Sequence, residues 1–171
     1  IQEAADLKVA TGTFSVPVLF GGEEDGLLEQ IVPDAFDGDS GVAIYEGTVD
    51  AHVDLSGLTD DDIDDDRSSR SIIITVHAPE LSDPNIDESR SEVVVQNRGV
   101  FTRVGEFFSD APLKEREQLD DVAVEALVDA AEQSTLDETA RANAEDFLVA
   151  LAEQMGYDDV TVRFREPPVD P

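Results

Sequence analysis

The hydrophobic period of this chain changes near residue 113, and that change constrains the fold more than any other feature. Before this point apolar and polar residues alternate, which is the pattern of half-buried β-strands. From Leu113 onward apolar residues recur every three or four positions through two segments, which predicts two amphipathic helices. Alternation returns at residues 159–165 and predicts a final strand. Strands followed by helices indicate an α+β fold.

Four stretches carry the strand pattern before the helices: residues 8–20, 41–58, 70–81 and 91–97. Pro17 cannot donate a hydrogen bond to a ladder, so it places the first strand at an edge or a bulge. The third stretch is apolar on both faces, which favours a central strand that Pro79 ends. Residues 21–41 are rich in Gly, Asp and Glu and are predicted to be mostly loop.

The second predicted helix follows Ser134 and Thr135, and Gly156 stands where its C-terminal cap belongs. In the final strand, alternate residues are expected to face the core, namely Val160, Val162 and Phe164. The apolar positions assigned to the second helix are Ala140, Ala144, Phe147, Leu148, Leu151 and Met155.

We therefore expect an antiparallel or mixed β-sheet of about five or more strands, with two consecutive C-terminal helices packed on one face and a final strand. Neither a repeat nor a domain boundary is visible. Residues 1–166 are expected to form a single α+β domain, followed by a disordered tail at 167–171.

The net charge limits the possible partners. The 171 residues include 41 acidic and 11 basic side chains, for a formal net charge of -30. This argues against nucleic acid and against docking of the protein surface on anionic lipid, because both are negatively charged. Two explanations for the acidity stay open: adaptation to high salt, or the ordinary acidic exterior of a protein from a GC-rich bacterium.

The most acidic stretch is DDDIDDDR at residues 60–67. It lacks the glycine at position six and the glutamate at position twelve that a calcium-binding loop requires. Because it lies between two strand patterns, it is predicted to be a connection between strands. We expect Ile63 to be at least partly buried, the aspartates to be exposed, and no cation to be held with full coordination.

A second candidate metal site lies on one strand face, where Asp50, His52 and Asp54 alternate with apolar residues. Neighbours on such a face are about 7 Å apart, so two of them can chelate one ion, whereas Asp50 and Asp54 are too distant to join easily. These three residues are weak candidates, and the alternative is a polar, solvent-facing side of an antiparallel sheet. The expectation is that no metal and no cofactor is bound.

Enzyme motifs are missing from the sequence: there is no G-x-S-x-G, H-E-x-x-H, P-loop or G-x-G-x-x-G, and there is no cysteine. A non-catalytic protein is therefore favoured. The alternative from another class is a cell-envelope hydrolase that uses surface carboxylates, since 41 acids leave many possible pairs.

The leading candidate for a binding surface is QNRGVFTRVGEFF at residues 96–108. Within it Arg98, Phe101, Arg103 and Phe107 combine arginine with aromatic side chains, which interfaces favour. The alternative is a segment that anchors the core while its arginines pair with surface acids.

Several stretches together resemble the uncharacterised bacterial family known as domain of unknown function 4230, particularly its actinobacterial branch. They are ATGTFSVPV, GTVDAHVDLSGL, IIITVHAPELSDPNID, RGVFTRVGEFF and the helix pair that ends in MGYDDVTVRF. The resemblance implies one N-terminal membrane helix followed by this domain outside the cytoplasm. It implies no catalytic residue and no cofactor.

The expected function is accordingly that of a membrane-anchored extracytoplasmic module that binds an unknown protein or envelope component. The chain begins at Ile1 rather than Met and holds no run of about 20 apolar residues, so the anchor would be an upstream helix absent from this chain. Besides the hydrolase, a soluble salt-adapted protein of a halophile is an alternative. The oligomeric state is left open.

Overall fold

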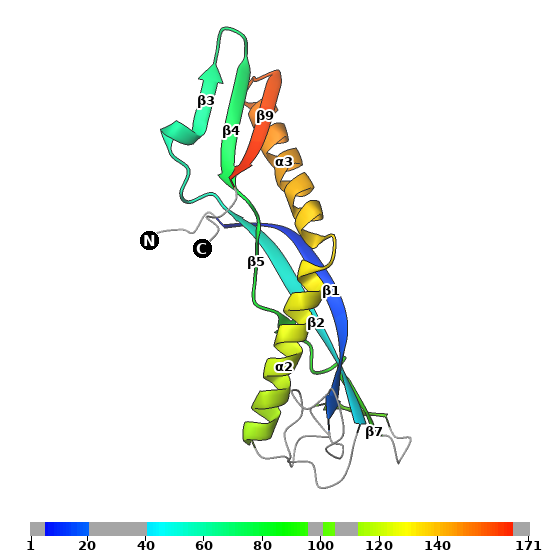
Figure 1. Ribbon diagram of the computed structural model, residues 1–171. Coiled ribbons are helices and arrows are strands. Elements are labelled where there is room, and N and C mark those ends of the chain that lie inside the picture. The colour runs from blue at the N-terminus through cyan, green and yellow to red at the C-terminus, as the bar shows by residue number, and fades with distance from the viewer. Residues whose placement is uncertain (1–5, 21–40, 96–100, 105–112, 166–171) are drawn as a thin grey trace. The chain divides into compact units, whose positions relative to one another are not determined.

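The computed structural model describes residues 6–20, 41–95, 101–104 and 113–165 (Figure 1). The chain divides into two compact units. Unit 1 consists of Ile1–Thr11, Asp50–Ser82 and Ser134–Pro171, and unit 2 consists of Gly12–Val49 and Asp83–Gln133. Each unit is therefore assembled from separate stretches of sequence, and the two long strands β1 (Asp6–Phe20) and β2 (Gly41–Asp54) contribute residues to both.

The larger sheet is built around β2, and its strand order is β1-β2-β7-β8. Its shorter strands are β5 (Glu80–Leu81), β6 (Asn85–Ile86), β7 (Glu92–Val95) and β8 (Phe101–Arg103). β7 pairs antiparallel with β2 and with β8, while β5 and β6 add short antiparallel pairings along β2. β1 ends the strand order, which agrees with the edge position that Pro17 predicts.

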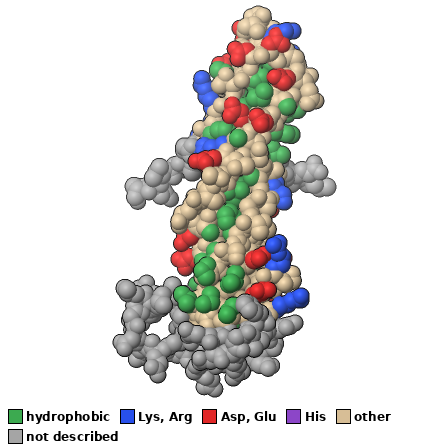
Figure 2. Space-filling model, turned by 90° about the vertical axis from the view of Figure 1, so that its right-hand side faces the viewer, with side chains coloured by type: hydrophobic (Ala, Val, Ile, Leu, Met, Phe, Trp, Pro, Cys, Tyr) green, Lys and Arg blue, Asp and Glu red, His purple; other side chains and the backbone are tan. Residues whose placement is uncertain are grey.

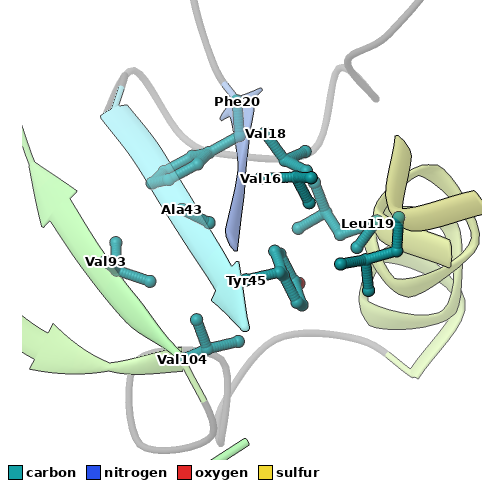
Figure 3. Close-up of a cluster of buried hydrophobic side chains, with 10 residues drawn as sticks. Val16, Val18, Phe20, Ala43, Tyr45, Val93, Val104 and Leu119 are labelled. Carbon is teal, nitrogen blue, oxygen red and sulfur yellow. The ribbon is translucent and has the colours of Figure 1, made fainter. Parts of the chain in front are cut away.

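The core of unit 2 lies between this sheet and α2 (Leu113–Glu132). Val16 of β1, Tyr45 of β2 and Leu119 of α2 point toward one another in this core (Figure 3). A Cβ atom at Gly47 would lie 2.8 Å from Leu127 Cδ1, so glycine at this position lets α2 approach β2 closely. The alternation predicted for β1 is confirmed, because its even-numbered residues from Val16 to Phe20 are buried.

Unit 1 contains a smaller sheet of three strands, β3 (Ile63–Asp66), β4 (Ser71–His77) and β9 (Asp159–Arg165). β4 is central, as the sequence predicts. It pairs antiparallel with β3 and parallel with β9, so Ile74 lies opposite Ile63 on one side and Val162 on the other. The sheet is therefore mixed.

The core of unit 1 forms where α3 (Leu136–Gln154) covers one face of the smaller sheet (Figure 1). Its buried side chains come chiefly from alternate residues of β4 and from every fourth residue of α3: Ile72, Ile74, Val76, Ala144, Leu148 and Ala152. The helix ends at Gln154, and Gly156 two residues later adopts φ +99° and lets the chain turn back toward β9. Val160, Val162 and Phe164 pack against this core as predicted.

The predicted α+β class, with its strands, two consecutive C-terminal helices and final strand, is confirmed. The structure adds that the helices serve different cores, α2 in unit 2 and α3 in unit 1. The single domain expected for residues 1–166 stays a prediction. The tail at 167–171 and residues 21–40 of the expected loop lie outside the described residues.

Candidate functional site

The predicted binding surface at residues 96–108 is described only in part. Arg98 and Phe107 lie outside the described residues. Phe101 and Arg103 belong to β8, the last strand in the order of the larger sheet, where Arg103 pairs with Glu92 of β7. The side chain of Arg103 is exposed. The structure thus places two of the four residues on a strand at the end of the sheet, and the binding role of all four stays a prediction.

The weak metal candidates of β2 interact with separate partners. Asp50 accepts hydrogen bonds from Lys8 Nζ at 3.2 Å and Thr11 Oγ1 at 2.5 Å. His52 Nδ1 lies 3.2 Å from an oxygen of Asp6. Asp54 accepts a hydrogen bond from the backbone N–H of the residue two positions later, at 2.7 Å. Within the parts of the chain that are described, no three His, Asp or Glu side chains gather in a metal-binding arrangement.

Hydrogen bonding explains the charge state of these acids. The Thr11 hydroxyl, followed by Lys8, holds the pKa of Asp50 below its ordinary value, although partial desolvation acts in the opposite direction. The hydrogen bonds from Ser56 lower the pKa of Asp54 in the same way. A general acid for polymer hydrolysis needs a raised pKa, so neither carboxyl group is suited to that role.

The acidic run at residues 60–67 differs from its prediction as a loop with an inward isoleucine. Its first part is a 3₁₀ turn, η1 (Asp60–Asp62), and its second part is β3. Ile63 is 41% exposed, whereas Asp62 is only 9% exposed, so the expected burial is reversed at these two positions. The reason is that the carboxylate of Asp62 is held by hydrogen-bond partners, whereas Ile63 belongs to neither hydrophobic core.

Those partners are Thr59 and Arg165. Asp62 accepts hydrogen bonds from the Thr59 backbone N–H at 3.0 Å and the Thr59 hydroxyl at 2.8 Å, which together cap the short turn. Arg165 of β9 donates a third at 2.5 Å. The Thr59 hydroxyl and then Arg165 lower the pKa of Asp62 to about 2. The run therefore contains a structural carboxylate that stays ionised at neutral pH.

On the face of the smaller sheet that α3 does not cover, acidic and basic side chains lie on different strands. Register places Asp64 of β3 opposite Ile73 of β4, which in turn lies opposite Thr161 of β9. Along this face β3 carries aspartates, while β9 carries the exposed arginines Arg163 and Arg165. Arg163 has no ion-pair partner among the described residues. On this face the β3 edge of the sheet is thus acidic, and the β9 edge is predominantly basic.

A row of exposed apolar side chains runs along α3. Helical spacing alone groups these residues with the buried core residues of the same helix. Phe147 is 45% exposed, Leu151 45% and Met155 67%. These residues are four positions apart, so they lie on one side of the helix, next to the buried row that includes Leu148. We call them the apolar row. Hydrophobic side chains reach the surface between charged ones on the face of the molecule drawn in Figure 2.

None of the helices in the described residues is long and apolar enough to span a membrane. No curated protein matches the chain. The solved structures likewise contain no match. A comparison with protein families matches residues 1–162 to proteins of unknown function, DUF4230, in agreement with the resemblance seen in the sequence. Since the match spans nearly the whole length, the chain belongs to the DUF4230 family.

Proposed function

We propose that this chain is a non-catalytic interaction domain that binds a protein component of the cell envelope. The observation that carries the proposal is the apolar row of α3, Phe147, Leu151 and Met155. Single exposed hydrophobic residues are normal on protein surfaces, but a contiguous set indicates a binding surface. The row is not needed for the core of unit 1, because α3 already buries Ala144, Leu148 and Ala152 there.

The charge of the chain indicates the chemistry of the partner. With a formal charge of -30, the surface repels phosphate and anionic lipid and attracts basic proteins. Acidic side chains such as Asp146 and Glu153 are exposed on the same helix. The partner that fits is therefore an apolar segment of a protein, flanked by Lys or Arg residues.

The location is proposed on the family resemblance. The resemblance implies a membrane helix before the domain, and such a helix would tether the domain outside the cytoplasm. A tethered domain meets its partner at a high effective concentration, so a modest apolar surface suffices for binding.

The proposal is tested by placing a photo-crosslinking amino acid at Leu151, and at Glu125 of α2 as the control position, in the native host. A protein that crosslinks at Leu151 but not at Glu125 is then purified. Its affinity is measured for the unmodified chain and for a double variant with Leu151→Ser and Met155→Ser. We expect the dissociation constant of the variant to rise about tenfold or more, because such substitutions remove apolar area from the contact.

The matched control is Ala150→Ser, since Ala150 is exposed on the same helix but lies outside the apolar row. This variant should bind like the unmodified chain. If no protein is trapped from Leu151, or if the trapped protein binds all three chains equally, the apolar row is not the binding surface and the proposal is wrong. Circular dichroism verifies that each variant keeps its fold.

A further inference from the structure

The outer edge of β9 is the feature on which this inference rests. β9 is the last strand in the order β3-β4-β9, and β4 occupies only one of its two edges. No other described strand pairs with the second edge. A strand of seven residues, Asp159–Arg165, therefore presents a line of backbone groups that can pair with another strand.

The hydrogen bonds on the inner edge identify the groups that point outward. The Asp159 N–H donates to Arg70 O at 3.3 Å, and the Ala78 N–H donates to Arg165 O at 3.0 Å. The odd-numbered residues of β9 thus bond toward β4. Because direction alternates along a strand, the even-numbered residues Val160, Val162 and Phe164 direct both N–H and C=O toward the free edge.

The burial of β9 agrees with an open edge. Ile72, Ile74 and Val76 of β4 face α3 and are 5%, 8% and 2% exposed. On the same face of the sheet, Val162 and Phe164 of β9 are only half-buried. The apolar side of β9 is therefore incompletely covered by unit 1 itself.

The sequence of β9 is complementary to itself in the antiparallel direction. About Val162 as the centre, Asp159 stands opposite Arg165, Val160 opposite Phe164, and Thr161 opposite Arg163. Opposite charges thus meet at both ends, and apolar residues meet on the face that α3 covers. Cross-strand pairs of these kinds stabilise an antiparallel ladder.

We propose that β9 pairs with β9 of a second copy of this chain, antiparallel and centred on Val162. The two three-stranded sheets then form one continuous sheet with a two-fold axis through the Val162 pair. Asp159 of each copy meets Arg165 of the other. Arg163, which has no ion-pair partner among the described residues, gains Asp159 of the second copy as one diagonal neighbour, and its other diagonal neighbour is Arg163 of that copy.

Neighbouring registers satisfy fewer of these groups. Centring the pair on Arg163 would place two arginines opposite each other, which is destabilising. Centring it on Thr161 would leave Phe164 and Arg165 without strand partners. A shift by one residue would place apolar side chains opposite charged ones. The register centred on Val162 is the one in which all seven residues of β9 pair.

Each copy carries a net charge of -30, so the two copies repel each other at low salt. The screening length is about 3 Å at 1 M salt, which removes most of this long-range repulsion while strand pairing persists. The dimer is therefore expected at high ionic strength. Its formation does not depend on the envelope partner proposed for α3.

The first test measures molar mass by sedimentation equilibrium in 1 M KCl. We expect twice the mass of the chain, and a monomer at millimolar protein concentration would overturn the inference. Val162→Pro removes an outward N–H without touching the bonds to β4, so it should give a monomer with an unchanged fold by circular dichroism. A Val162→Pro variant that stays dimeric would show that another surface pairs, and would equally overturn the inference.

A second pair of variants tests the charges without altering the backbone. Asp159→Lys places a cation opposite Arg165 of the other copy and should raise the dimer dissociation constant about tenfold or more. Glu153→Lys on α3 makes the same change in net charge away from β9 and should not weaken the dimer. If both variants behave alike, net charge rather than the strand pair determines association, and the inference is wrong.

The register is tested by crosslinking, which is straightforward because the chain has no cysteine. Opposite residues of an antiparallel pair have Cα atoms about 5.5 Å apart, within disulfide range, so Val162→Cys should crosslink to itself on oxidation. In this register, Thr161 of one copy is about 8 Å from Thr161 of the other, so Thr161→Cys should not. The reverse outcome would contradict the register centred on Val162.

Discussion

Arg165 donates a hydrogen bond to Asp62 Oδ1 at 2.5 Å, and this contact joins the last strand of the chain to the acidic run. Thr59 donates two more hydrogen bonds to the same carboxylate, so three donors converge on one side chain. This convergence explains why the acidic run is ordered around Asp62 rather than around Ile63.

Asp62→Asn is expected to lower the melting temperature at pH 7. The pKa of Asp62 is about 2 in the folded chain against an ordinary 3.8. A lowered pKa means that the ionised carboxylate stabilises the fold fully above about pH 4, and that this contribution is lost as the pH falls toward 2. The variant should therefore lose less stability than the unmodified chain between pH 4 and 2. Thermal melts across this range measure the effect.

Asp61→Asn is the matched control for that prediction, because Asp61 belongs to the same turn and its side chain is exposed. It should leave both the melting temperature and its pH dependence nearly unchanged. Equal destabilisation by the two variants would mean that the total charge of the run, rather than the Asp62 hydrogen bonds, determines stability there.

Gly47→Ala is expected to destabilise the core of unit 2. The new Cβ would lie 2.8 Å from Leu127 Cδ1 and 3.1 Å from the backbone oxygen of Asn85, so the side chain of Leu127 must move. Overpacking of this kind costs about 1–3 kcal/mol in the free energy of unfolding. Urea unfolding measures it. In a Leu127→Ala background the same substitution should cost distinctly less, because the methyl groups that collide are gone.

Gly57→Ala provides the control for the core prediction, since no atom lies within 4 Å of its added Cβ. It should change the free energy of unfolding by no more than about 0.5 kcal/mol. If Gly47→Ala is equally neutral, the close approach of α2 to β2 is not required for the fold.

Tyr157 is expected to titrate above the ordinary tyrosine value of 10. Burial, and then the hydrogen bond that its hydroxyl donates to Asp65 at 3.0 Å, raise the pKa of Tyr157. A raised phenol pKa stabilises the fold at lower pH, and this contribution is lost as the pH rises above 10. The chain has two tyrosines, so a Tyr45→Phe variant allows Tyr157 to be followed alone by ultraviolet absorption.

Asp65→Asn should lower the Tyr157 midpoint in that titration, because it removes both the charge and the carboxylate acceptor. Asp64→Asn is the control, as Asp64 lies on the other face of β3 from Asp65. A Tyr157 midpoint that does not respond to Asp65→Asn would show that burial alone raises the pKa.

Salt is expected to raise the melting temperature. Like charges repel within a compact chain of net charge -30, and increasing KCl from 0.1 M to 1 M shortens the screening length from about 10 Å to about 3 Å. Thermal melts in KCl are compared with melts in an uncharged osmolyte, which is excluded from the protein surface but does not screen its charges. A melting temperature insensitive to KCl would exclude the salt-adaptation explanation of the acidity.

Arg103→Ala tests the surface predicted around β8. Its side chain is exposed, so we expect the melting temperature to change little. If Arg103 takes part in binding, the variant should bind the purified partner more weakly than Arg67→Ala, a change at an exposed arginine of the β3–β4 turn. Equal affinities would show that Arg103 does not bind that partner.

Local patterns in the sequence predict much of this fold. Alternation identifies β1, β4 and β9, and the three-and-four spacing identifies both helices, because each pattern reflects which side of one element is buried. The parallel pairing of β9 with β4 could not be predicted, since it joins segments separated by both helices. Hydrophobic spacing also does not show how much of a helix its sheet covers, so spacing alone groups Phe147 and Leu151 with the core.

The arrangement of the candidate sites likewise depends on contacts between residues that are distant in sequence. The separate partners of Asp50 and His52 depend on Lys8, Thr11 and Asp6, which are distant in sequence, so alternation alone suggests a chelating pair. The inward turn of Asp62 depends on Arg165, which lies more than one hundred positions later. The density of charged residues along the chain indicates neither arrangement.

The late position of β9 has a consequence for how the protein is made. β4 leaves the ribosome long before its parallel neighbour β9 is translated, so one edge of β4 is unpaired during this time. The apolar side chains of Ile72, Ile74 and Val76 also lack the contacts that α3 and β9 later provide. The acidic residues of β3, on the other edge, are translated first and discourage pairing with foreign strands. The smaller sheet gains its third strand only after β9 has left the ribosome, so the emergence of β9 completes the folding of unit 1.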